Sequence, residues 1–186
     1  MKNTILIVDD EVKVISALKR ALSDEPYEVQ SATSAEEALN ILKTQKFKVV
    51  ISDERMPGMD GSEFLAIVKT GYPETVRIML TGHTGLEELM NAINRGEVYR
   101  FFVKPWNDMD VIMAIRYALE KYDLEAENRR LLKTVRNQGV ELKVMERRYA
   151  GITRLEKDKN GNLLLPDFTE DEIAEILSEC EMQYKV

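Results

Sequence analysis

The sequence is poor in the residue types that build thiol and imidazole sites. It has 186 residues with one cysteine, Cys180, and one histidine, His83. A single cysteine excludes an intramolecular disulfide and a multi-cysteine metal site, and a single histidine leaves a histidine-based metal or proton-shuttle site without a partner. We therefore expect a reducing, cytoplasmic setting and interpret Cys180 as a small core residue.

Long apolar runs and a positive charge balance are also absent. No apolar stretch approaches the roughly 18 residues of a membrane span. The N-terminal MKNTILIVDDE has a short apolar run that ends in three acids, which is not the pattern of a signal peptide. The formal net charge of −7 opposes binding driven by the phosphates of a nucleic acid. We expect neither nucleic acid nor membrane as a partner.

Short apolar runs alternate with helical patterns over the first two thirds of the chain. Strands are predicted near Thr4–Val8, Tyr27–Ser31, Lys48–Ser52, Val76–Leu80 and Tyr99–Val103. Helices are predicted from Val12, from Ala35 after the capping pair Ser34 and Glu37, from Ser62, from Leu86, and from Asn107 with Asp110. This alternation indicates βα units around a parallel sheet, and we predict an α/β domain over residues 1–122.

The fifth helix is predicted to continue to residue 150. A 4-3 spacing, typical of a coiled-coil seam, runs through Tyr117, Lys121, Leu124, Asn128, Leu131, Val135, Gln138, Leu142, Met145 and Tyr149. The two amides interrupt this seam, and Gly139 weakens the helix. The prediction for residues 107–150 is a coiled coil between two copies. The alternative is a solvated helix that packs on its own domain.

Residues 151–186 are predicted to form a hairpin and an amphipathic helix of unknown role. ITRLEKDKNGNLLL places two short strands around Asn160-Gly161, a strong hairpin signal, and Thr169 begins the helix. The alternative is a calcium loop, because the spacing from Glu156 to Asp167 imitates an EF-hand. The hairpin explains the same residues more simply, since Pro166 and a short final acid do not suit a calcium loop.

Polar residues follow four of the predicted strands. Asp9, Asp10 and Glu11 follow the first strand, Asp53 the third, Thr81 the fourth and Lys104 the fifth. In a parallel sheet these positions share the edge where ligands bind. Acids gathered there need a cation, and an all-oxygen set suits Mg2+. With an ammonium for an anion and a hydroxyl donor, the set indicates phosphoryl transfer onto an aspartate.

Each of these residues has an ordinary structural explanation when it is taken alone. Asp53 could form a turn, Asp10 could cap the first helix, and Thr81 before Gly82 could be turn chemistry. Lys104 could be a solvated loop residue. Only their joint occurrence, each after a predicted strand, favours a chemical site.

The motifs ILIVDDE, SDERMPGMDG, MLTGH and FFVKPW, in this order, resemble those of a response-regulator receiver domain of two-component signalling. The resemblance implies a flavodoxin-like, doubly wound (βα)5 sheet of order 2-1-3-4-5. It implies Asp53 as the phosphoryl acceptor, and Thr81 and Lys104 as ligands of the phosphoryl group. The implied Mg2+ ligands are Asp9, Asp10, Asp53 and the backbone carbonyl of Arg55.

The resemblance implies further roles around this site. Phe101 occupies the family's aromatic switch position, and a cis peptide is usual before the proline that corresponds to Pro105. Arg55 and His83 lie where the family tunes dephosphorylation. We expect Arg55 to shield the phosphoryl group and slow its loss.

The resemblance also implies partners and an output. We expect a histidine kinase or phosphotransfer protein as donor, and no enzymatic activity beyond the chemistry of Asp53 itself. Phosphorylation would alter the face of the fourth helix, fifth strand and fifth helix, changing homodimerisation or the binding of an unknown downstream protein. The alternatives are a phosphorelay intermediate, or a receiver from a larger regulator with an enzymatic output such as cyclic-di-GMP turnover. INRGEVYRFFVKPWNDMD resembles receivers attached to HD-GYP domains.

Overall fold

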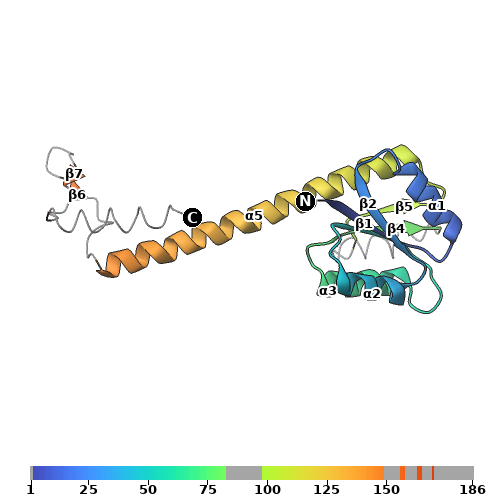
Figure 1. Cartoon of the computed structure of the whole chain (residues 1–186), viewed down its shortest axis with the longest axis horizontal. Helices are drawn as coiled ribbons and strands as arrows, with labels where there is room; N and C mark the ends of the chain where they lie inside the picture. Colours follow the sequence, from blue (N-terminus) through green and yellow to red (C-terminus); the bar gives the residue numbers. More distant parts are fainter. Residues whose placement is uncertain (1, 83–97, 149–155, 158–162, 165–168, 170–186) are drawn as a thin grey trace. The chain divides into compact units, whose positions relative to one another are not determined.

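A computed structural model describes residues 2–82, 98–148, 156–157, 163–164 and 169 of the chain (Figure 1). The chain divides into two units, Met1–Arg130 and Leu131–Val186. The predicted helix near Leu86, together with His83 and Cys180, lies outside the described residues.

The first unit is built on one parallel sheet of five strands. These are β1 (Asn3–Val8), β2 (Tyr27–Ala32), β3 (Val49–Asp53), β4 (Val76–Thr81) and β5 (Arg100–Val103). Their order is β2-β1-β3-β4-β5, and every neighbouring pair is parallel. The flavodoxin-like topology predicted from the motifs is therefore confirmed, and each strand lies within one or two residues of its predicted position.

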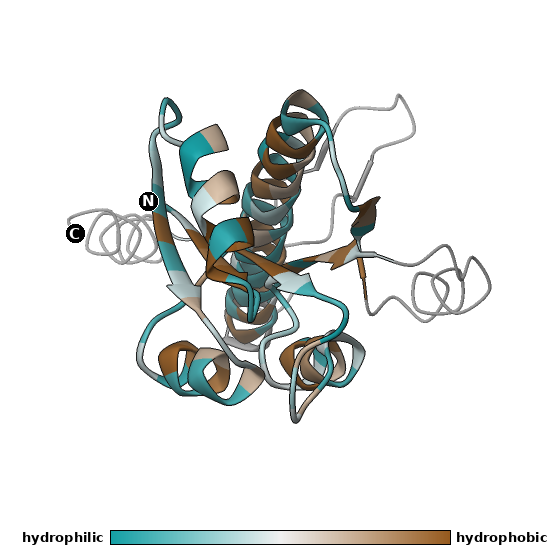
Figure 2. Cartoon of the chain, turned by 90° about the vertical axis from the view of Figure 1, so that its right-hand side faces the viewer, coloured by the Kyte–Doolittle hydropathy of each residue, from teal (hydrophilic) through white to brown (hydrophobic). Residues whose placement is uncertain are grey.

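Helices cover both faces of the sheet (Figure 2). Among the described residues of this unit the helices are α1 (Val12–Ala21), α2 (Ala35–Thr44), α3 (Gly61–Gly71) and α5 (Asp108–Arg148), which extends past residue 130. Alternate residues of β1 serve the two faces: Ile5 and Ile7 pack in the core that contains residues of α1 and α5, whereas Leu6 and Val8 pack in the core that contains residues of α2 and α3. Burial on both faces explains why β1 and β3 are almost continuously apolar.

Side-chain caps fix the starts of three helices. Ser34 accepts a hydrogen bond from the Glu37 amide at 3.2 Å, as predicted, but the Glu37 carboxylate accepts from the amide and hydroxyl of Thr33. The capping box is thus displaced by one residue, because Thr33 offers two donors to the same oxygen. Asp60 caps α3 through the Glu63 amide at 2.8 Å.

Asn107 caps the start of α5, as the predicted capping pair of Asn107 and Asp110 requires, and the helix itself begins at Asp108. The Asn107 Oδ1 accepts hydrogen bonds from the amides of Met109 at 2.8 Å and Asp110 at 3.4 Å. The described part of the helix runs to Arg148, and residues 149 and 150 of the predicted range lie outside the described residues. Seven apolar side chains of its later turns are exposed: Leu124, Leu131, Leu132, Val135, Val140, Leu142 and Val144.

The second unit contains two short paired strands, β6 (Glu156–Lys157) and β7 (Leu163–Leu164). They are antiparallel, as the predicted hairpin requires, and Glu156 pairs with Leu164. The Asn160-Gly161 turn and the helix predicted after Thr169 lie outside the described residues.

In the part of the chain that the structure describes, no helix has the length and apolar character to cross a membrane.

Candidate functional site

The carboxyl edge of the sheet gathers the predicted site residues from four strands. Asp9 directly follows β1, Asp53 ends β3, Thr81 ends β4 and Lys104 directly follows β5. The parallel register brings these strand ends together, because Asp53 lies opposite Leu80 and Thr81 lies opposite Val103. Residues far apart in the sequence therefore share one edge, as the sequence predicts.

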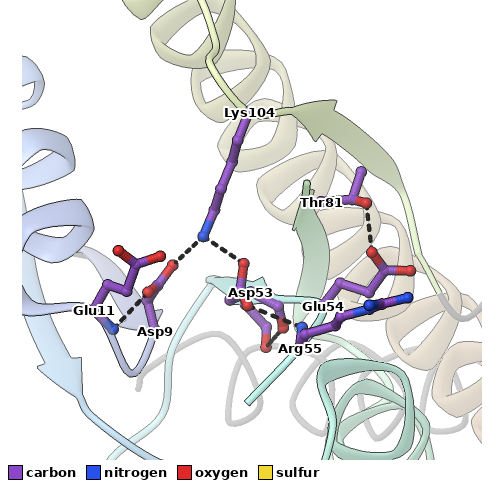
Figure 3. A network of polar contacts seen from close by, with 8 residues as sticks. Asp9, Glu11, Asp53, Glu54, Arg55, Thr81 and Lys104 are labelled. Atoms are coloured by element: carbon purple, nitrogen blue, oxygen red, sulfur yellow. Dashed lines mark hydrogen bonds and ion pairs between the residues drawn. The ribbon is translucent and has the colours of Figure 1, made fainter. Parts of the chain in front are cut away.

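Lys104 joins two of the acids. Its Nζ lies 2.5 Å from Asp53 Oδ1 and 2.9 Å from Asp9 Oδ2 (Figure 3). Asp9 is fully buried and Asp53 is 6% exposed, so both carboxylates depend on a nearby cation for compensation. One ammonium serves two carboxylates, and these three groups carry a net negative charge.

The electrostatics of this cluster differ between the acid and the base. Burial raises the pKa of Asp9, although hydrogen bonds from Lys104 and from the Glu11 amide oppose the shift. Burial by itself lowers the pKa of Lys104, but hydrogen bonds to Asp53 and Asp9 outweigh burial and raise this pKa overall. Lys104 therefore stays cationic at neutral pH, while the Asp9 carboxylate is held in a pocket that penalises its charge.

The loop after β3 holds Asp53 through its backbone. The Arg55 amide donates to Asp53 Oδ2 at 2.9 Å, and the Ser52 hydroxyl donates to the Asp53 carbonyl oxygen at 2.9 Å. The loop then returns so closely that a Cβ on Gly61 would lie 1.8 Å from that carbonyl oxygen. Gly58 turns the loop with φ of +83°, a region that favours glycine. Gly58 and Gly61 thus allow the backbone of the loop to pass close to Asp53.

Thr81 has a partner that the sequence did not reveal. Its hydroxyl donates to Glu54 Oε2, and Thr81 is fully buried whereas Glu54 is partly exposed. Glu54 directly follows Asp53, and the strand pattern gives no reason to pair it with a residue of the next strand. Strand spacing predicts which residues share an edge, but it does not predict which side chains across that edge touch.

The remaining predicted residues lie around this centre. Phe101 is partly buried and packs against the core cluster that includes α2 and α3 residues. The Lys104-Pro105 peptide is cis, as the resemblance implied. Arg55 is exposed, and its amide touches Asp53. His83 lies outside the described residues, so its predicted place near the site stays a prediction.

The predicted gathering of three carboxylate side chains is not present in the described residues. Asp10 is exposed, and no three acidic, histidine or cysteine side chains among residues 2–82 and 98–148 stand close enough to hold a metal. Lys104 draws Asp9 and Asp53 together, whereas the neighbouring Asp10 side chain lies in solvent. Two buried carboxylates and backbone carbonyl oxygens still form an all-oxygen donor set, which fits Mg2+ with water completing its shell.

Comparison with known proteins identifies the class. Residues 5–116 match the model of the response regulator receiver domain, and the chain belongs to this family. The hydrogenase transcriptional regulatory protein HoxA of Cupriavidus necator is 39% identical over 128 residues, which are 69% of this chain and 26% of that protein. Members of the family bind Mg2+ in an acidic pocket and interact with histidine kinases or phosphotransfer proteins.

Two solved structures share both the fold and much of the sequence. One is the signal receiver domain of an HD domain-containing protein from Pseudomonas fluorescens Pf-5, with 40% identity, a TM-score of 0.64, and coverage of 68% of this chain and 93% of that one. The other, described as an adenylate cyclase from Rhodopirellula baltica, has 39% identity, a TM-score of 0.68, and coverage of 72% and 98%. The chain spans only about a quarter of the length of curated relatives such as HoxA.

Proposed function

We propose that the chain accepts a phosphoryl group on Asp53 from the phosphohistidine of a kinase or phosphotransfer protein. One observation carries the proposal: the Lys104 ammonium bridges Asp53 and Asp9 at the carboxyl edge of the sheet. An ammonium fixed beside the acid can form a charge-assisted hydrogen bond with an oxygen of the incoming phosphoryl group. Membership of the receiver family supports the same role.

In the proposed transfer an oxygen of the Asp53 carboxylate attacks the phosphorus. A P–O bond forms, the P–N bond to the donor histidine breaks, and its electron pair returns to the imidazole nitrogen. The Arg55 amide and Lys104 orient the acceptor through opposite oxygens of the carboxylate. Lys104 and the Thr81 hydroxyl then bind the phosphoryl oxygens, which requires Thr81 to change partner.

Mg2+, when bound, would supply positive charge between the carboxylates and the incoming phosphoryl group. Asp9, Asp53 and the Arg55 carbonyl oxygen are the proposed ligands that lie at this edge. Asp10, exposed in the structure, is the further ligand that the resemblance implies. The proposed role of Asp9 follows from its full burial, because a buried carboxylate gains most from a hard cation.

The proposed output is a change in how copies or partners bind the receiver and its long helix. The exposed apolar residues of α5 include Leu124, Leu131, Val135 and Leu142, four members of the predicted seam. Apolar side chains at this spacing favour pairing of two helices. Because Lys104 lies in the short connection between β5 and α5, a phosphoryl group that binds Lys104 could bias the pairing of α5.

A second candidate is a receiver that serves a larger regulator. It is favoured by the short span of this chain, which matches 26% of the HoxA length, and by the HD domain-containing protein among the similar structures. In this case the receiver would act on a separate or attached output domain. Light scattering with beryllofluoride, an aspartyl-phosphate mimic, distinguishes the two candidates. A change between monomer and dimer supports an output through α5, and a constant state favours an output domain.

Asp53→Asn tests the acceptor directly. Wild type incubated with acetyl phosphate and Mg2+ should gain the mass of one phosphoryl group, and Asp53→Asn should gain none. Asp24→Asn, which removes an exposed acid outside the site, should label like wild type. Labelling of Asp53→Asn at the wild-type level would refute the acceptor assignment.

Arg55 is proposed to lengthen the life of the phosphoryl group. Its side chain is exposed while its amide binds Asp53, so the guanidinium can lie over the modified acid. Arg55→Asn should lose the label several-fold faster, which mass spectrometry over time would measure. An unchanged decay rate would refute this role.

A further inference from the structure

Glu54 is the acid in this site that the proposed phosphoryl transfer does not use. It follows Asp53 directly, yet the two side chains serve different partners: Asp53 faces Lys104, and Glu54 reaches Thr81 (Figure 3). The backbone of Glu54 is fixed on both sides. Its amide donates to the Leu80 carbonyl at 2.8 Å, and its own carbonyl accepts from the Gly61 amide at 2.8 Å.

The hydrogen that the Thr81 hydroxyl donates to Glu54 can serve only one acceptor at full strength. A hydroxyl has a single hydrogen to donate, and an ionised carboxylate can only accept. While the Thr81 hydroxyl donates to Glu54, it cannot donate to an oxygen of a phosphoryl group on Asp53. The two acids therefore compete for the same hydrogen.

The charge change at Asp53 provides a way to end this competition. A phosphoryl group carries roughly 1.5 to 2 negative charges at neutral pH and replaces the single charge of the Asp53 carboxylate, so negative charge increases directly beside Glu54 in the chain. Like charges repel, and Glu54 is partly exposed, so its carboxylate can turn into solvent without burying an unpaired charge. Thr81 is fully buried and stays at the site.

We propose that Glu54 is a positioning residue that holds the Thr81 hydroxyl in the unphosphorylated state and yields it to the phosphoryl group. Glu54 thereby lowers the affinity of the site for a phosphoryl group, because the hydrogen bond between Thr81 and Glu54 must break before Thr81 can bind that group. This inference rests on the proposed function of Asp53 as the acceptor. Glu54 is neither the acceptor nor a proposed metal ligand, and its proposed role is to oppose the change of partner at Thr81.

The test measures the affinity of the full chain for beryllofluoride in the presence of Mg2+. Trp106, the one tryptophan in the sequence, lies two residues after Lys104 and reports binding by fluorescence. Glu54→Ala should bind roughly tenfold more tightly than wild type, the change expected when a hydrogen bond to a charged acceptor no longer has to be broken. Glu54→Gln should lie between them, because its amide oxygen still accepts but carries no charge.

Two controls separate this role from a merely structural one. Glu63→Gln, at an exposed position of α3, should bind beryllofluoride like wild type. In a Thr81→Ala background, Glu54→Ala should no longer tighten binding, because the hydroxyl that Glu54 holds is gone. An equal gain in both backgrounds would overturn the proposal, since Glu54 would then act by charge alone.

The outcomes also distinguish this proposal from the proposed function. If wild type binds beryllofluoride and Glu54→Ala binds it equally or more weakly, the restraint by Glu54 is refuted while the acceptor role stands. If wild type neither binds beryllofluoride nor labels at Asp53, both are refuted. If Glu54→Ala does not unfold cooperatively and is therefore not properly folded, the comparison of wild type with Glu54→Gln still tests the proposal. The Thr81 methyl resonance, compared between wild type and Glu54→Gln without beryllofluoride, reports the contact itself.

Discussion

Two lysines join separate elements at opposite edges of the same sheet. Lys104 follows β5 at the carboxyl edge and binds Asp9 and Asp53. Lys48 precedes β3 at the amino edge, where its Nζ lies 2.7 Å from an oxygen of Asp123 on α5 and 2.9 Å from Asn3 Oδ1. Both side chains are largely buried, so the difference between them lies in their partners.

The charge balance of the two clusters is different. Lys104 has two carboxylates, so a negative charge remains, whereas Lys48 has one carboxylate, a neutral amide and the Tyr122 ring, 5.7 Å from its Nζ. A balanced cluster has no electrostatic reason to bind another ion. The net negative charge of the Lys104 cluster favours binding of a cation. This difference in charge distinguishes the candidate functional site at Lys104 from the structural ion pair at Lys48.

The amino-edge cluster holds α5 beyond its apolar packing. Leu119 is the last buried core residue of α5, and the partly buried Tyr122 still packs against the same core. The Lys48–Asp123 pair directly follows Tyr122 along the helix. Arg129 then pairs with Glu74 at 3.2 Å. Ion pairs therefore continue the attachment of α5 for about two turns after Tyr122, the last α5 residue that packs against the core.

Gly61→Ala should have the largest effect and would show how tightly the carboxyl edge is built. The new Cβ would meet the backbone oxygen of Asp53 at 1.8 Å, so the loop must move, and we expect the free energy of unfolding to fall by about 3 kcal/mol. Urea denaturation measures this change. Gly139→Ala is the matched control: no atom lies within 4 Å, and helix content by circular dichroism should rise. Equal stability of wild type and Gly61→Ala would contradict the close approach.

Lys104→Met and Lys48→Met compare the two lysines directly. Lys104→Met should weaken beryllofluoride binding roughly a hundredfold, the loss expected for an ammonium that binds an anion in a buried site. Lys48→Met should bind within about twofold of wild type, because its cluster lies at the far edge of the sheet. Calorimetric titration in Mg2+ measures both affinities. Similar losses of beryllofluoride affinity in Lys104→Met and Lys48→Met would contradict the distinction between a functional site at Lys104 and a structural ion pair at Lys48.

Removing one partner of the Lys48–Asp123 pair should lower the free energy of unfolding by different amounts, depending on which partner is removed. Asp123→Asn leaves a lysine that is 6% exposed without its counter-charge, and we expect a cost of about 2 kcal/mol. Lys48→Met leaves Asp123, whose side chain is 54% exposed and can be hydrated, so about 1 kcal/mol is expected. Urea denaturation of both variants measures the difference. A larger cost for Lys48→Met would mean that the lysine stem, and not its charge, dominates.

Glu25 and the exposed Arg116 form an ion pair at the protein surface that should give the smallest effect. A hydrogen bond from Arg116 lowers the pKa of Glu25 below its ordinary value of 4.5. A lowered acid pKa adds stability above that value and loses it as the pH falls below it toward the folded-state pKa. Glu25→Gln should therefore flatten the decline in melting temperature below pH 4.5. A decline as steep as that of wild type would show that the pair contributes nothing.

The sheet and its edge residues could be predicted from the sequence because their signals are local. Strands buried on both faces are apolar throughout, and the residue after each such strand lies at the carboxyl edge in any parallel sheet. This reasoning places Asp9, Asp53, Thr81 and Lys104 together without any knowledge of contacts. The cap at Ser34 is local in the same way, since its partner lies three residues on.

Contacts between side chains of different elements could not be predicted in this way. The Thr81–Glu54 bond depends on the rotamers of two side chains on adjacent strands, and the Lys48–Asp123 pair joins residues 75 positions apart. Asp10 differs from Asp9 in burial although the two are adjacent, because its side chain is exposed while that of Asp9 is fully buried; its role as a metal ligand stays a prediction. Neighbours in sequence need not share an environment at the end of a strand.

The short edge strand β5 places its two phenylalanines in different layers. Phe101 packs with the core that includes α2 and α3, whereas Phe102 packs with the core that includes α1 and α5. Each face of β5 is therefore covered by a different core, and both phenylalanines are partly buried. A substitution at Phe101 should disturb the packing of the α2 and α3 layer without directly removing a contact of the α1 and α5 layer.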